Sequence, residues 1–80
     1  MELSQAQPPT TLSHGEPPYP VGTLVEDTAS GRTGELRGVI EERLAQSGRV
    51  VRRTAYLRPR GGGVEWEVPA SEVRPAVVNG

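Results

Sequence analysis

The chain has 80 residues and a net charge of −1, with 34% hydrophobic residues, ten glycines, eight prolines and no cysteine. This length holds one small domain, and no apolar run approaches the ~20 residues of a membrane span. The lack of cysteine excludes disulfides, thiolate zinc sites and a cysteine nucleophile. It also favours a cytoplasmic protein, as does a polar N-terminus without the apolar run of a secretion signal.

The first twenty residues differ in composition from the remainder. They contain five prolines, and their few apolar residues follow no period. Such a segment buries too little surface to offset the entropy lost on ordering. The sequence therefore predicts a disordered, proline-rich tail over residues 1–20 and a folded domain over residues 21–78.

The folded part has the alternation and the glycine-rich turns of short β-strands. The strands are expected at residues 22–27, 33–42, 50–58, 64–68 and 73–76. Gly31 should supply a positive φ in the turn after the first strand, and Gly34 and Gly38 suggest bulges or bends in the second. Residues 40–47 fit either one helical turn or a wide hairpin loop. Residues 69–72 have the composition of a 3₁₀ turn.

Alternation assigns side chains to the two faces of the third and fourth strands. Val51, Ala55 and Leu57 are expected toward the core, together with Val64, Trp66 and Val68. A hairpin that matches these faces places Leu57 opposite Trp66 and Ala55 opposite Val68. Trp66 is then expected to be a core residue.

Five short strands, glycine bends and a late 3₁₀ turn are typical of a small β-barrel. The segments Val21-Gly-Thr-Leu-Val-Glu-Asp27, Ser30-Gly-Arg-Thr-Gly34 and Val64-Glu-Trp-Glu-Val-Pro-Ala-Ser-Glu-Val-Arg-Pro75 resemble SH3-like barrels of the KOW type. The chain is also similar to small, arginine-rich actinobacterial proteins. The resemblance implies an all-β, five-stranded SH3-like barrel, and it carries fold but no function.

Charge points to a candidate surface. Residues 28–64 contain eight arginines and three glutamates, and all basic residues of the chain are arginine. Arginine suits bidentate anion contacts and stacking, although a GC-rich genome produces the same bias without a functional cause. On the outward face of the third strand, Arg52, Tyr56 and Arg58 could contact phosphates and stack on a base. The remaining candidate binding residues are Arg49, Arg53 and Arg60.

A competing interpretation leaves this face as a solvated ladder. The same hairpin register places Arg58 opposite Glu65 and Tyr56 opposite Glu67. Interleaved carboxylates would repel phosphate. The fold, the tail and the near-neutral net charge of −1 favour a protein partner, and nucleic acid stays the alternative.

Nothing in the sequence indicates catalysis. His14 is the only histidine, it lies in the expected tail, and no nucleophile, base or metal ligand is spaced to work with it. We therefore expect a non-enzymatic binding or accessory module without a cofactor, metal or membrane partner, in the form of a monomer.

Overall fold

The computed structural model describes residues 8–77, which form strands and a single 3₁₀ turn. The elements are β1 (Thr10–His14), β2 (Leu24–Asp27), β3 (Thr33–Leu44), β4 (Val50–Pro59), β5 (Trp66–Pro69), η1 (Ala70–Glu72) and β6 (Val73–Pro75). The fold class is all-β, as expected. Within residues 8–77, no helix has the length and hydropathy needed to cross a bilayer.

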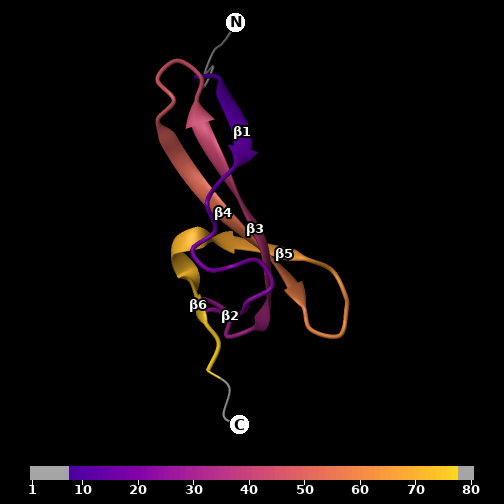
Figure 1. The fold of residues 1–80 in the computed structure, drawn as a ribbon. Coiled ribbons are helices and arrows are strands. Elements are labelled where there is room, and N and C mark those ends of the chain that lie inside the picture. The colour runs from indigo at the N-terminus through magenta and orange to yellow at the C-terminus, as the bar shows by residue number, and fades with distance from the viewer. Residues whose placement is uncertain (1–7, 78–80) are drawn as a thin grey trace, which may run out of the picture.

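One antiparallel sheet contains all six strands (Figure 1), with the order β5-β4-β3-β2-β6 and β1 added on β3. β3 is long enough to hold two neighbours on one edge. Its residues 33–35 pair with β2, and its residues 40–44 pair with β1. Among the described residues no ladder joins β5 to β6, so the sheet is open and the expected barrel closure is not confirmed.

The core lies at the end of the sheet that carries β2, β5 and β6. Tyr19 and Trp66 pack against it and are partly buried. Its buried apolar side chains are Val25, Leu36, Val39, Ala55, Leu57, Val68, Ala70 and Val73. Beyond this core, β1 and residues 40–44 and 50–54 continue as a three-stranded extension, which we call the arm (Figure 1). Every residue of β1 is exposed, so backbone pairing rather than burial holds β1 in place.

Several local expectations are confirmed. Gly31 has a φ of 79°, and a register shift lies between Leu36 and Gly38, where a bulge or bend was expected. The 3₁₀ turn follows β5 directly. In the hairpin of β4 and β5, Ala55 lies opposite Val68 and Leu57 opposite Trp66, which is the register that the apolar faces predict.

The expected disorder over residues 1–20 is wrong for Thr10–His14, which form β1, whereas residues 1–7 lie outside the described part. Thr10 and Thr11 are β-branched and suit an extended strand, and the edge of β3 supplies the backbone partners that the local sequence lacks. Between residues 40 and 47 the chain forms no helix, but the hairpin loop contains one helix-like turn, which is closed by the Gly48 N–H donating to the Leu44 carbonyl oxygen at 2.8 Å. β3 continues to Leu44, and a short hairpin loop with Gly48 at a φ of 74° follows.

Two expected core residues are exposed. Val51 lies on the arm with an exposed fraction of 48%, and Val64 lies in the loop before β5 with 85%. Val51 is the extra residue at the register shift between Glu42 and Arg43, and Val64 precedes β5, so strand alternation does not set the face of either side chain. Trp66 packs on the core while keeping part of its ring accessible, so it is less buried than the sequence predicts.

Candidate binding surface

The arginines of β4 are divided between two faces of the arm. Arg52, Thr54 and Tyr56 alternate with Arg53 and Ala55, so Arg52 and Arg53 point to opposite sides of the sheet. Arg53 shares its face with the core residue Ala55, but it lies beyond the core. The candidate residues on β4 therefore do not make one continuous basic face.

Carboxylates of β3 balance both of these arginines. In the β3–β4 ladder, Glu42 lies opposite Arg52 and Glu41 lies opposite Arg53. The Arg52 Nε is 3.9 Å from the Glu42 Oε1, and the Arg53 Nε is 3.2 Å from the Glu41 Oε2. Carboxylates do balance arginine charges, as the sequence predicted, but these carboxylates belong to β3. Glu65, expected opposite Arg58, precedes β5 and lies outside the ladder.

Glu41 is the centre of the tightest charge cluster. The Arg43 Nη2 donates to its Oε1 at 2.7 Å, and Arg53 donates to its other oxygen. The hydrogen bond from Arg43 is the largest cause that lowers the pKa of Glu41, and the charges of Arg43 and Arg53 act in the same direction. Arg53 also donates to the Glu16 carbonyl oxygen at 2.7 Å, which ties the segment after β1 to the arm. Both arginines are thus occupied within the fold.

A hollow of about 300 Å³ lies beside Tyr56 on the opposite face. Gly38 lies directly opposite Tyr56 in the ladder, and a Cβ at Gly38 would have no atom within 4 Å, so the missing side chain leaves open space. The hollow is lined by His14, Arg37, Gly38, Val39, Ile40 and Tyr56. The wall is mainly apolar, and Arg37 and His14 add polar groups to it. The sequence singled out Tyr56 and Gly38, but it gave no sign that His14 would join them.

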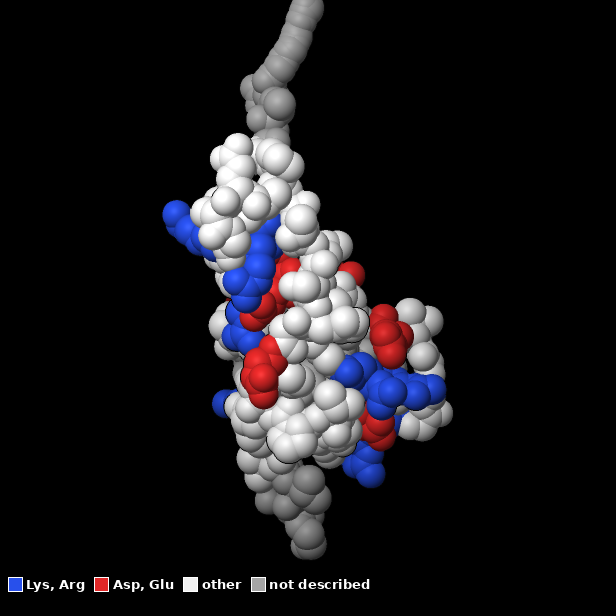
Figure 2. Space-filling view, turned by 45° about the horizontal axis from the view of Figure 1, so that its top comes forward, with Lys and Arg blue, Asp and Glu red and all other residues white. Residues whose placement is uncertain are grey.

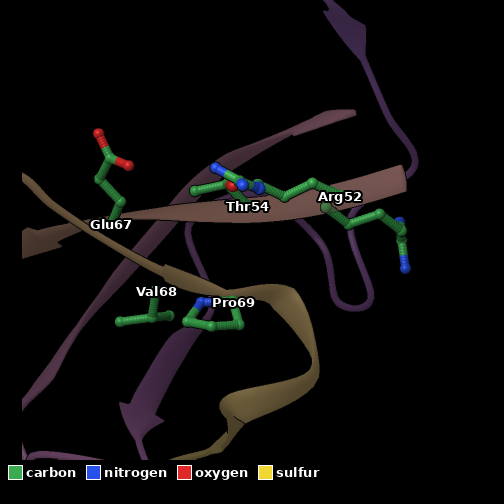
Figure 3. A pocket seen from close by; sticks show the side chains of 6 residues that line it. Arg52, Thr54, Glu67, Val68 and Pro69 are labelled. Atoms are coloured by element: carbon green, nitrogen blue, oxygen red, sulfur yellow. The ribbon is translucent and has the colours of Figure 1, made fainter. Parts of the chain in front are cut away.

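A second groove of about 290 Å³ lies where β5 turns away from β4. The β4–β5 ladder ends at Thr54 and Pro69, so residues 52 and 53 continue without a neighbour on that edge. In Figure 3, Val68 and Pro69 lie along β5, while Glu67 and Arg52 stand at opposite ends of the groove. The acid at one end and the pairing of Arg52 with Glu42 make this groove a poor site for an anion.

The remaining candidate arginines are dispersed. Arg49 lies in the loop before β4 and Arg60 in the loop after it, and β4 has ten residues, so about 30 Å separates its ends. Arg58 is exposed near the second end, opposite Glu35 of β3. On the face seen in Figure 2, blue arginine and red carboxylate side chains lie next to each other rather than in separate patches.

A polar cluster that was not predicted from the sequence lies at the edge of the core. Asp27, only 4% exposed, accepts hydrogen bonds from the Ser30 hydroxyl at 2.9 Å and from the Trp66 Nε1–H at 3.1 Å. The Arg32 guanidinium lies 3.7 Å from the centre of the Trp66 ring. An aspartate directly before a turn, with a serine three residues later, is the signal that could have predicted the first contact. The cluster fixes the β2–β3 turn against β5, which is a structural role.

No protein-family model, curated protein or solved structure matches this chain.

Proposed function

We propose that the chain is a non-enzymatic binding module that recognises a protein partner through the face of the arm that carries Tyr56. One observation carries this proposal. The hollow beside Tyr56 is a mainly apolar, open depression on the sheet face that carries Tyr56 and Ile40. A hollow of this kind accepts an apolar side chain of a partner.

The composition of the hollow agrees with a protein interface. Tyrosine and arginine are enriched among the residues that contribute most to binding energy, and the polar border around an apolar centre excludes water. Tyr56 and Ile40 supply apolar surface, and Arg37 and His14 supply polar groups. Arg37 retains one loose ion pair, at 3.9 Å to Glu35, so its guanidinium can still turn toward a partner.

We further propose that the fold is an SH3-like barrel of the KOW type with β1 as an added strand. Without β1, the remaining strands follow the order β6-β2-β3-β4-β5, and the 3₁₀ turn separates the last two strands of the chain. This arrangement supports the resemblance noted from the sequence. The cytoplasmic location stays a prediction.

Nucleic acid is the alternative partner. Tyr56 with Arg37 and His14 beside it favours this alternative, because an aromatic ring between basic groups can stack on a base. The close ion pairs of Arg43 and Arg53 with Glu41 oppose it, because a phosphate backbone would have to displace or approach that carboxylate, whereas Arg52 keeps only a loose pair with Glu42 at 3.9 Å. We therefore rank the protein partner first.

The proposal is tested by capture with variants of the hollow. The chain has no lysine, so it can be immobilised through its N-terminal amine alone and exposed to a lysate of its own cells. Tyr56→Ala removes the aromatic wall and Gly38→Val fills the open space, whereas Arg60→Gln changes an exposed loop residue far from the hollow. Proteins that bind wild type and Arg60→Gln, but neither hollow variant, support the proposal. Capture that is equal for all four chains, or that consists of nucleic acid, contradicts it.

A further inference from the structure

β1 has a hydrogen-bonded neighbour on one side only among residues 8–77. Two hydrogen bonds at the ends of β1 show toward which side each N–H and C=O group of the strand points. The Gly15 N–H donates to the Val39 carbonyl and the Ala45 N–H donates to the Pro9 carbonyl, each at 2.9 Å. Both bonds belong to the register of the β1–β3 ladder, in which Leu12 lies opposite Glu42.

Antiparallel ladders alternate between hydrogen-bonded and non-hydrogen-bonded pairs. Since residues 9 and 15 belong to hydrogen-bonded pairs, Thr11 and Ser13 also direct their N–H and C=O groups toward β3. The other three residues, Thr10, Leu12 and His14, direct theirs away from β3. The outer edge of β1 therefore presents three N–H and C=O pairs.

This edge lacks the features that normally prevent strand addition. Natural edge strands carry charged residues, prolines or bulges that discourage pairing with another chain. β1 contains no acidic or basic residue apart from a histidine, no proline and no glycine. Leu12, at its centre, has an exposed fraction of 72%. By contrast, the part of the β4 edge without a neighbouring strand carries Arg52 and Arg53, whose charges discourage pairing with another strand.

We propose that β1 is the interface with a second copy of this chain, joined by antiparallel pairing centred on Leu12. In this register Leu12 lies opposite Leu12 of the second copy, and Thr10 lies opposite its His14. It is the one antiparallel register in which all three outward-facing residues pair, each pair exchanging two hydrogen bonds. The second copy fits because the edge is self-complementary.

The side chains agree with this register. On one face the two Leu12 side chains meet and cover each other, and on the other face Thr11 lies opposite Ser13 of the second copy, a hydroxyl pair that stabilises a sheet. No charged side chain of β1 faces a like charge. The two arms then form one continuous sheet, with the two cores at opposite ends, because β1 lies at the end of the molecule away from β6 (Figure 1).

Cysteine trapping tests the register. The chain has no cysteine, so Leu12→Cys introduces a single thiol. In a hydrogen-bonded antiparallel pair the opposed Cα atoms are about 5.5 Å apart, which a disulfide can span. Ser13→Cys is the matched control on the same strand, because Ser13 lies opposite Thr11 and its own counterpart is more than ~7 Å away. We expect Leu12→Cys to give a covalent dimer at least tenfold faster than Ser13→Cys under mild oxidation.

Sedimentation velocity tests the association without a cross-link. The interface is small, so the wild-type chain is examined from about 10 μM to about 1 mM, where a weak dimer becomes populated. Leu12→Pro removes an N–H that faces away from β3 and therefore leaves the β1–β3 bonds intact, whereas Leu12→Thr keeps the N–H. Association of wild type and Leu12→Thr, with a monomeric Leu12→Pro, is the expected result.

A wild-type chain that stays monomeric throughout this range, as expected from the sequence, overturns the proposal. Equal oxidation of the two cysteine variants overturns the register.

Discussion

Two glycines of β3 differ in what a side chain would meet. A Cβ at Gly34 would lie 2.6 Å from the Arg58 carbonyl oxygen and 2.8 Å from the Trp66 Cη2, whereas a Cβ at Gly38 would meet nothing within 4 Å. Gly34 thus lets β4 and the indole ring approach β3 closely. Gly38 instead leaves space open, and that space is part of the hollow beside Tyr56.

We predict opposite outcomes for the two alanine variants. Gly34→Ala must push against the backbone of β4 and should lower the free energy of unfolding by about 1–3 kcal/mol. Gly38→Ala removes a flexible residue from a strand without a clash and should leave stability unchanged or raise it by about 0.5 kcal/mol. Urea unfolding followed by Trp66 fluorescence measures both. A Gly34→Ala chain as stable as Gly38→Ala would contradict the close packing of Trp66 on β3.

Asp27 should make stability depend on pH at the acid end. Burial raises its pKa, but hydrogen bonds from Ser30, Trp66 and Ala29 outweigh burial and leave the pKa below 3.8. Since the folded pKa is lower than the unfolded value of about 3.9, the stabilisation is present above that value and is lost as pH falls through the folded pKa.

We therefore predict that Asp27→Asn destabilises the fold by about 1–3 kcal/mol near neutral pH, because a donor amide then faces the Ser30 and Trp66 donors. The same variant should lose less stability than the wild-type chain as the pH falls below about 4. Thermal unfolding of both chains across pH 2.5–7 provides the comparison. If the stability of the two chains falls in parallel as the pH is lowered, Asp27 is not the titrating group.

At the scale of elements, β1 shows where sequence reasoning fails. The strand positions, the 3₁₀ turn and the β4–β5 register follow from alternation and turn residues, which are local signals. β1 has no apolar face to reveal it, and its partner in β3 lies some thirty residues away in the chain. Val51 and Val64 fail for a different reason, since alternation holds only within a regular strand, whereas Val51 lies at a register shift and Val64 lies in the loop before β5.

Hydrogen exchange tests the pairing of β1 residue by residue. In dilute solution, where the chain is monomeric, the amides of Thr11, Ser13, Glu41 and Arg43 should exchange at least tenfold more slowly than those of Thr10, Leu12 and His14. The reason is the alternation of the β1–β3 ladder, in which only the first group donates across the strands. Fast exchange throughout residues 10–14 would restore the disordered tail expected from the sequence.

At the scale of the whole molecule, the sequence could not predict which acids balance the arginines. Residues 28–64 carry more arginines than acidic residues. In the fold, however, glutamates of β3 lie against Arg43, Arg52 and Arg53. Glu26 of β2 pairs with Arg74. The candidate surface is therefore divided into an apolar hollow at Tyr56 and separate arginines, with Arg49 at one end of β4 and Arg58 and Arg60 at the other end. This division is the basis for ranking a protein partner above nucleic acid.

A titration with short fluorescent single-stranded oligonucleotides tests that ranking most directly. Anisotropy is measured at about 20 mM and about 150 mM salt for the wild-type chain and for Arg52→Ala/Arg58→Ala. We predict weak binding at the lower salt concentration and negligible binding at the higher one, because the ion-paired arginines release few counterions. Micromolar binding that persists at about 150 mM salt and disappears in Arg52→Ala/Arg58→Ala would contradict the account and make nucleic acid the partner.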